Sequence, residues 1–239
     1  MKRLPFILAF FAAGLCAATI CRAAEQPKHL AAAIDLLGRL DLQNTSYRHG
    51  EPQVTWQGVC QSHTDCSGLL DALLMHCYGY SPDDYKRWFD SHRPSARRYH
   101  DAIVGERGFR EIRLLSEVLP GDVLAVKYLN RTDTTGHIML VADRPRRIAP
   151  VEPVMAQTEQ WEVPVIDSSH SGHGPTDTRY RRGPNGKDHE GMGSGVFRIY
   201  SDAEGRVAGF SWSTTRASKF VAPDDEHLVI GRFIPGFKP

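Results

Sequence analysis

The fold is decided by the stretch Asp65-Cys66-Ser67-Gly68-Leu69-Leu70-Asp71-Ala72-Leu73-Leu74-Met75-His76-Cys77-Tyr78, the clearest helical pattern in the sequence. Its apolar side chains recur at i, i+3, i+4, i+7, i+8 and i+11, positions that share one face of an α-helix: Cys66, Leu69, Leu70, Leu73, Leu74 and Cys77. Gly79 follows directly, and a glycine just past a helix is a common stop signal. We therefore expect a helix over residues 66–78 with its apolar face buried in the core.

The pattern is helical before this segment and extended after it. The apolar side chains of residues 28–40 have helical spacing and predict an amphipathic helix: Leu30, Ile34, Leu37 and Leu40. Strands are expected over residues 123–129, 137–142, 161–169, 196–200, 207–212 and 227–233. Loops are expected over residues 41–65, 130–136, 144–160 and 170–195, the last one flexible, with a helical insertion over residues 80–118. Helices followed by consecutive strands indicate an α+β fold, with N-terminal helices packed on an antiparallel sheet.

The composition is that of a globular protein, with 239 residues of which 41% are hydrophobic and 24% charged. Such a chain is long enough to bury a core without disulfides or metals. The formal net charge of +1 gives no indication of a nucleic-acid partner. These values exclude disordered and collagen-like chains.

The N-terminus has the pattern of a secretory signal peptide. The basic start Lys2-Arg3 precedes an apolar run over residues 4–20, and the small residues Cys21 and Ala23 fit a cleavage site. Cleavage after Ala23 would leave residues 24–239 as one domain in the periplasm or the extracellular space. We expect no stable membrane insertion after cleavage.

Three cysteines remain in the mature chain, namely Cys60, Cys66 and Cys77. An odd number in an oxidising compartment leaves at least one thiol unpaired. Two arrangements stay open: a disulfide between Cys60 and Cys77 that leaves Cys66 free, or Cys77 simply buried on the apolar face of its helix.

Cys66 occupies the head of the strongest helix. The free N–H groups and partial positive charge of a helix N-terminus favour a thiolate, which is the nucleophilic form. The same N–H groups could hold the oxyanion that forms during acyl transfer. In a plainer interpretation, Cys66 is only the first apolar residue of the buried stripe.

A thiolate nucleophile needs a base, and the base needs a group that orients it. His137 begins an apolar strand, and Asp167 lies near the end of the next long strand. If the two strands are antiparallel neighbours around the loop 144–160, which centres on residue 152, position 137 faces position 167. The pairing nominates Asp167 as the residue that orients His137, with His137 as the base for the Cys66 nucleophile.

Four short motifs then give a resemblance to a known family, the NlpC-type cell-wall peptidases, which are papain-like cysteine hydrolases. Asp65-Cys66-Ser67-Gly68-Leu69 resembles that family's Asp-Cys-Ser-Gly-aliphatic signature. The other three motifs that resemble the family follow its order: Pro120-Gly121-Asp122-Val123-Leu124, Gly136-His137-Ile138-Met139-Leu140-Val141 and Val165-Ile166-Asp167-Ser168-Ser169. Tyr47, in Tyr47-Arg48-His49-Gly50, is similar to a tyrosine upstream of the family's cysteine.

The resemblance implies a papain-like fold and the same three catalytic residues, with Tyr47, Asp65 and Ser67 beside the nucleophile as substrate-binding residues. It implies cleavage of an amide bond in peptidoglycan stem peptides, often between D-glutamate and a diamino acid, without a metal or other cofactor. In the family, the pair that flanks the cysteine can hold a free amino end of the stem peptide.

Two other functions stay open. A zinc hydrolase could use His137, Asp167, His170 and His173, because zinc sites often use histidines at short spacing. An exported binding protein could keep the fold without catalysis. The arginine-rich stretch Arg179–Arg182 is expected to be a solvated part of the 170–195 loop, and Trp212 is expected in the core.

Overall fold

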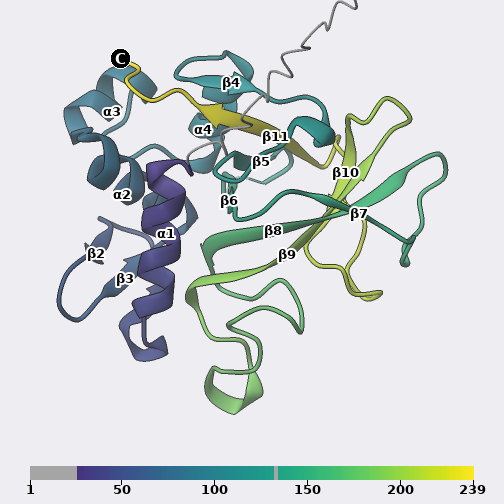
Figure 1. The fold of residues 1–239 in the computed structure, drawn as a ribbon, viewed down its shortest axis with the longest axis horizontal. Coiled ribbons are helices and arrows are strands. Elements are labelled where there is room, and N and C mark those ends of the chain that lie inside the picture. The colour runs from purple at the N-terminus through teal and green to yellow at the C-terminus, as the bar shows by residue number, and fades with distance from the viewer. Residues whose placement is uncertain (1–25, 132–133) are drawn as a thin grey trace, which may run out of the picture.

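The computed structural model describes residues 26–131 and 134–239, and the signal peptide expected over residues 1–23 lies outside them. The described residues form an α+β fold in which the helices gather on one side and the long strands extend on the other (Figure 1). The α-helices of this part of the chain are α1 (Lys28–Arg39), α2 (Cys66–Tyr78), α3 (Pro82–Phe89) and α4 (Ala96–Val104). No helix among the described residues has the length and apolar character needed to cross a membrane.

The strands form two sheets. The large sheet is antiparallel throughout and has the order β10 (Val207–Ser211), β9 (Gly191–Ser201), β8 (Glu159–Ser169), β6 (Gly136–Val141), β5 (Val123–Tyr128), β11 (Glu226–Phe233) and β4 (Phe109–Glu111), with β7 (Arg146–Ile148) also paired to β8. The small sheet has the order β1 (Thr45–Tyr47), β3 (Gln61–Thr64) and β2 (Gln53–Thr55), and its β1–β3 pair is parallel. The expected combination of N-terminal helices and an antiparallel sheet is confirmed.

Helix α2 begins and ends at the predicted residues. It begins after Asp65 because the Asp65 carboxylate accepts a hydrogen bond from the N–H of Gly68 at 2.7 Å, which satisfies one free donor of the first turn. It ends at Gly79, whose left-handed backbone, with φ of 75°, is accessible to glycine at little cost. The four leucines of its apolar face are buried, as predicted: Leu69, Leu70, Leu73 and Leu74. Each buried leucine contributes about 1.5–3 kcal/mol relative to an exposed one.

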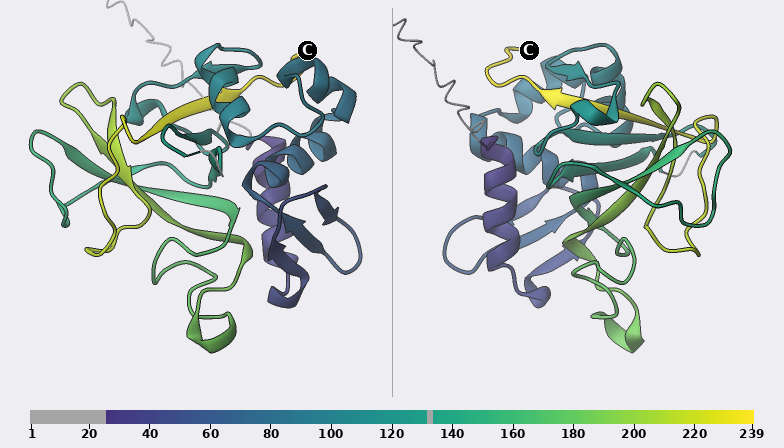
Figure 2. Two further views of the ribbon diagram at one scale, coloured as in Figure 1. Left: turned by 180° about the vertical axis from the view of Figure 1, so that it is seen from behind. Right: turned by 45° about the vertical axis from the view of Figure 1, so that its right-hand side comes forward.

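Both faces of the central strands are buried. On β5, Val123 and Ala125 pack against the helices, whereas Leu124 and Val126 face a second apolar core. The sheet curls until β10 approaches β11, and the second core fills the inside of the curl. Figure 2 shows from behind that the helices cover only one side of the sheet. The central strands are therefore packed on both faces, against the helices on one side and against the second apolar core on the other.

Two expectations for the N-terminal part are wrong in detail. Helix α1 buries Leu30, Ala33 and Leu36, whereas Ile34, expected on the buried face, is 44% exposed. Residues 41–65, expected as a loop, contain the whole small sheet. Its strands have only three or four residues, too few for an alternating pattern to stand out in the sequence.

The 80–118 segment is helical as expected, but it also contributes β4 to the large sheet. Five of its aromatic residues are buried in the core that contains α2: Tyr85, Trp88, Phe89, Tyr99 and Phe109. The segment is therefore an integral part of the core.

The flexible surface loop expected over residues 170–195 is also corrected. Its last five residues belong to β9, which pairs along its full length with β8. His173, Asp177 and Arg179 are buried, and Arg179 is fully inaccessible although we expected it to be solvated. Buried partners for these charged groups explain the difference, as described below.

The three cysteines of the described residues are all free thiols. The disulfide considered between Cys60 and Cys77 is therefore not formed. Cys60 is buried, whereas Cys77, expected to be buried, is only half-buried.

A buried carboxyl group ties the insertion to α2. Asp71 accepts a hydrogen bond from the Tyr99 hydroxyl at 2.6 Å, and its backbone carbonyl accepts one from the Tyr85 hydroxyl at 2.8 Å. Its second carboxyl oxygen has no hydrogen-bond partner among the described residues. Burial raises the pKa of Asp71 well above its usual value, although the Tyr99 hydrogen bond opposes that shift.

Replacing Asp71 by Asn is expected to stabilise the protein at alkaline pH. Because the pKa of Asp71 is higher in the folded state, the carboxyl stabilises the fold fully below the unfolded value of about 3.9, and this contribution is lost as the pH rises. Asp71→Asn keeps an acceptor for Tyr99 and cannot ionise. Its free energy of unfolding in urea should exceed that of the wild type by about 1–3 kcal/mol at pH 8, with a smaller difference at pH 4.

The exposed Asp224 provides the control, since Asp224→Asn should change stability equally little at both pH values. A constant difference between Asp71→Asn and the wild type across this pH range would contradict the ionisation argument.

Candidate active site

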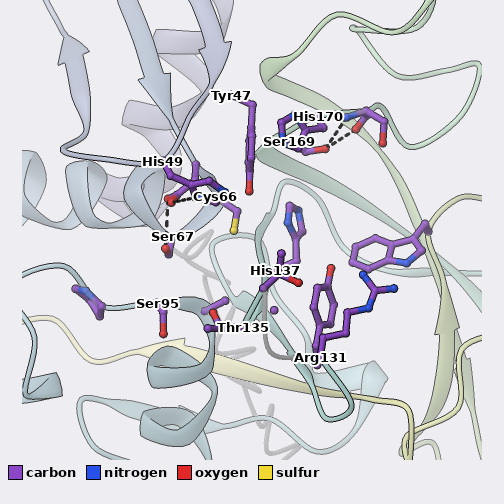
Figure 3. A pocket seen from close by; sticks show the side chains of 18 of the residues that line it. Tyr47, His49, Cys66, Ser67, Ser95, Arg131, Thr135, His137, Ser169 and His170 are labelled. Atoms are coloured by element: carbon purple, nitrogen blue, oxygen red, sulfur yellow. Dashed lines mark hydrogen bonds and ion pairs between the residues drawn. The ribbon is translucent and has the colours of Figure 1, made fainter.

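The N-terminus of α2 presents the Cys66 thiol to the large sheet. The side chain projects from the first turn, where the partial positive charge of the helix N-terminus favours an anion. Figure 3 shows the sulfur pointing toward the ring of His137, which lies at the start of strand β6. Two segments that are 71 residues apart thus meet in one site.

His137 is held between Cys66 and Asp167. Its Nε2 lies 2.6 Å from Oδ2 of Asp167, which leaves Nδ1 for the sulfur of Cys66. Burial alone would lower the pKa of His137, but the charge of Cys66 and the hydrogen bonds to Asp167 and Cys66 raise it to about 10. The imidazole therefore carries its proton at neutral pH and can deliver it to a leaving group.

The predicted contact between His137 and Asp167 is present, although the register behind it is wrong by two residues. The observed pairs are Leu140 with Ile166 and Val141 with Val165, so the register extends to His137 opposite Ser169. A shift of two residues keeps every side chain on the same face of the sheet. Asp167 therefore still points to the side of His137.

Asp167 is fully buried and accepts three side-chain hydrogen bonds. Oδ2 also lies 3.0 Å from Nε2 of His173, and Oδ1 accepts a hydrogen bond from Nη2 of Arg179 at 2.7 Å. Burial would raise the pKa of Asp167, but the charges of Arg179 and His173 and the hydrogen bond from His137 hold it well below its usual range. The carboxylate thus stays ionised and fixed.

Asp177 holds Arg179 by hydrogen bonds, and glycines on β9 leave the space that this pair occupies. Its Nε and Nη2 donate to the two oxygens of Asp177 at 2.9 and 2.8 Å, and its Nη1 donates to the carbonyl of Gly191. A Cβ atom at Gly193 would clash with Arg179, and one at Gly195 would clash with Asp177. The alternating glycines of β9 therefore create the space for this buried ion pair.

Both ring nitrogens of His173 face hydrogen-bond acceptors. Nδ1 lies 2.8 Å from the carbonyl of Trp212, and Nε2 lies 3.0 Å from Asp167. The ring is therefore held between a backbone carbonyl and a carboxylate. His173, Arg179 and His137 together enclose the carboxylate of Asp167.

Three features around Asp167 were not predicted from the sequence: Arg179, Asp177 and the contact of His173 with Asp167. The Gly191-Met192-Gly193-Ser194-Gly195 alternation was the available signal, because glycines two residues apart leave one face of a strand bare. Trp212, expected in the core, is half-buried and lies edge-on to His137 with ring centroids 5.5 Å apart.

A cavity of about 500 Å³ opens over Cys66 and His137. The three residues expected beside the nucleophile all line it: Tyr47, Asp65 and Ser67. In Figure 3 the hydroxyl of Tyr47 points toward Cys66 and His137. Burial and the nearby charges of Cys66 and Asp65 raise the pKa of Tyr47, so the phenol keeps its proton and can donate a hydrogen bond.

The cluster of His137, Asp167 and His173 also has the composition of a metal site, with ligand atoms within 4.8 Å of one another. Two of the separations are 2.6 and 3.0 Å, which are hydrogen-bond distances. Ligands 2.0–2.2 Å from a tetrahedral zinc ion would lie about 3.3–3.6 Å apart. His170 is elsewhere, packed against Tyr47 and 3.3 Å from Glu190. The geometry therefore favours acid–base chemistry at this cluster.

The chain is 35% identical over 222 residues to an uncharacterised protein of Acanthamoeba polyphaga mimivirus. The alignment covers 87% of this chain and 96% of the viral protein. No protein-family model matches the sequence. No solved structure matches it either.

The Asp167–Arg179 pair predicts a large effect for a conservative substitution. Arg179→Lys keeps the positive charge but loses the fork that bridges Asp167 and Asp177, so two buried carboxylates lose hydrogen bonds. We expect the free energy of unfolding in urea to fall by about 3 kcal/mol. The matched control is Arg182→Lys, an exposed arginine of the same segment, which should change stability by less than about 0.5 kcal/mol. Equal effects of the two substitutions would refute the buried network.

Proposed function

We propose that this chain, which belongs to the same family as the mimivirus protein, is a cysteine hydrolase that cleaves an amide bond through an acyl-enzyme. The observation that carries the proposal is the convergence of three groups: Cys66 and His137 line one cavity, and Asp167 is buried behind His137 and bonded to its ring. The nucleophile heads a helix, and the base and its orienting carboxylate lie on adjacent strands β6 and β8. This arrangement supports a papain-like architecture.

In the first step, the Cys66 thiolate attacks the amide carbonyl carbon and a tetrahedral intermediate forms. His137, paired with the sulfur, then gives its Nδ1 proton to the amide nitrogen. The carbon–nitrogen bond breaks, the amine leaves, and the acyl group remains on the sulfur as a thioester. Asp167 stabilises the imidazolium and holds the ring so that Nδ1 faces the reacting atoms.

Two donors are suited to hold the oxyanion. The N–H groups of Gly68 and Leu69 are used by Asp65, which caps the helix, so the N–H of Cys66 is the nearest donor left at the helix N-terminus. The protonated hydroxyl of Tyr47 points to the same place (Figure 3). Preorganised donors of this kind stabilise charge that develops in the transition state.

In the second step, neutral His137 takes a proton from water, and the hydroxide attacks the thioester. The thioester bond breaks, the carboxylic acid leaves, and the Cys66 thiolate and His137 imidazolium are restored. Trp212, edge-on to His137, shields the ring from bulk water on one side. The cycle needs only water as co-substrate.

The proposed substrate is a stem peptide of peptidoglycan. The enzyme would cleave it in the periplasm or in the extracellular space. The resemblance of the four motifs to NlpC-type peptidases supports it, as does the placement of the motif residues Gly136–Val141 and Val165–Ser169 on the two strands that flank the cavity. A zinc hydrolase and an inactive binding protein are the alternatives that the experiments below must separate from a cysteine hydrolase.

Iodoacetamide labelling tests the nucleophile. Cys66 should react much faster than Cys60 and Cys77, and His137→Gln should slow its reaction by about tenfold or more because the thiolate loses its paired cation. The rates are measured by peptide mass spectrometry at pH 7. Slow and equal labelling of all three thiols would favour an inactive binding protein.

Digestion of purified peptidoglycan tests the reaction. The wild type should release fragments whose masses report a cut amide bond, Cys66→Ala should release none, and His137→Gln should lose about 10²–10⁴ in rate. Cys77→Ala, which removes a half-buried thiol away from the site, is the matched control and should match the wild type. Activity that survives in Cys66→Ala and disappears with a chelator would identify a zinc hydrolase instead.

A further inference from the structure

We propose that Arg93 is a positioning residue for the nucleophile: its guanidinium offsets the charge of the Asp65 carboxylate and thereby favours the thiolate form of the neighbouring Cys66. The inference rests on the proposed hydrolase function, because it concerns how that nucleophile is kept reactive. Arg93 lies between α3 and α4, in the 80–118 insertion, and lines the same cavity as Asp65 and Cys66. It acts on the sulfur through Asp65, to which it is hydrogen-bonded.

The carboxylate of Asp65 has two opposite effects at the head of α2. It caps the helix, because Oδ1 accepts hydrogen bonds from the N–H of Gly68 at 2.7 Å and from the hydroxyl of Ser67 at 3.3 Å. It also places a negative charge next to Cys66, and a negative neighbour disfavours the ionised form of a thiol. Asp65 is buried, so solvent screens its charge poorly. A thiolate beside this cap therefore needs a compensating cation.

Arg93 supplies the compensating charge. Its Nη2 donates a hydrogen bond to Oδ2 of Asp65, and Nδ1 of His49 donates to the same oxygen at 2.9 Å. A neutral imidazole can donate such a bond, whereas a guanidinium is always charged. The side chains of Asp65 and Arg93 are only 7% and 27% exposed. The ion pair is therefore largely removed from water, and its two charges offset each other at close range.

The opposite effects of the two charges are felt by other groups nearby. Burial raises the pKa of Asp71; the charge of Asp65 raises it further, whereas the charge of Arg93 lowers it. On the cavity side, burial and the charges of Cys66 and Asp65 raise the pKa of Tyr47. The charge of Asp65 thus reaches a group that faces the sulfur. Removal of Arg93 would leave this charge without its cationic partner.

The remaining surroundings of the sulfur stay constant when Arg93 is changed. Besides Asp65, Arg93 and His49, the ionisable groups that line the cavity around Cys66 are Tyr47, Tyr128, Arg131, His137, His170 and His173. Three of them, Tyr47, Tyr128 and His137, interact with the charge of Cys66. Within residues 26–131 and 134–239, no hydrogen bond or ion pair links any of the six to Arg93. A substitution of Arg93 is therefore transmitted to the sulfur through Asp65.

The pH dependence of Cys66 alkylation tests this role. The rate of iodoacetamide labelling at Cys66 is measured from pH 4 to pH 9 by peptide mass spectrometry, and the midpoint of its rise reports formation of the thiolate. In Arg93→Gln the midpoint should move up by about 1 pH unit, so labelling below both midpoints should be about tenfold slower than in the wild type. Arg93→Lys keeps the positive charge, so its midpoint should stay close to that of the wild type.

A replacement of the carboxylate assigns the shift to the ion pair. Asp65→Asn keeps an oxygen that can cap α2 but carries no charge, so its midpoint should fall below that of the wild type. The double replacement Asp65→Asn with Arg93→Gln removes both charges and should return the midpoint close to the wild-type value. Arg97→Gln, at an exposed arginine of the same segment, is the control and should leave the midpoint unchanged.

An unchanged midpoint in Arg93→Gln, equal shifts in Arg93→Gln and Arg93→Lys, or a double replacement that stays shifted would each overturn the inference. If Arg93→Gln does not fold, Asp65→Asn decides, because a midpoint that does not fall contradicts the role of the charge. A reactive wild-type Cys66 whose midpoint ignores Arg93 would refute this inference and leave the hydrolase intact. A wild-type Cys66 that labels no faster than Cys60 and Cys77 would instead refute the hydrolase.

Discussion

The site depends on the hydrogen bonds and ion pairs that hold the buried carboxylate of Asp167. It is inaccessible to water, yet it remains charged because Arg179, His137 and His173 all direct N–H groups at it. A buried charge is tolerated only when it is paired and hydrogen-bonded, so each partner constrains the others. The same constraint fixes the ring of His137 and, through it, the approach to Cys66.

The fold explains how these groups reach one place. Helix α2 contributes Cys66 from its first turn, and the neighbouring strands β6 and β8 contribute His137 and Asp167. Both central strands are packed on two faces, so the site rests on rigid elements. The segment 80–118, folded into the same core, adds Arg93 to the lining of the cavity.

Part of the fold and of the site could be predicted from the sequence, because the patterns that determine them span only a few neighbouring residues. The bounds of α2 follow from the cap residue Asp65, the leucine stripe and Gly79, which act within a few residues of one another. The contact between His137 and Asp167 followed from antiparallel pairing, and it tolerated a register error of two residues because side chains alternate with a period of two. Three short strands were not predicted, because an alternating pattern cannot be recognised in three or four residues: 45–47, 53–55 and 61–64.

The sequence by itself determined the helix that carries Cys66, the order of the main strands along the chain, and the grouping of Cys66, His137 and Asp167. Only the tertiary structure decided that Arg179 is buried beside Asp167, and that Arg93 is paired with the carboxylate of Asp65, next to Cys66. The physical reason is that an arginine in a polar segment looks solvated unless its partners are known. Those partners lie 12 and 28 residues away along the chain, and they are brought close by packing that no local pattern encodes.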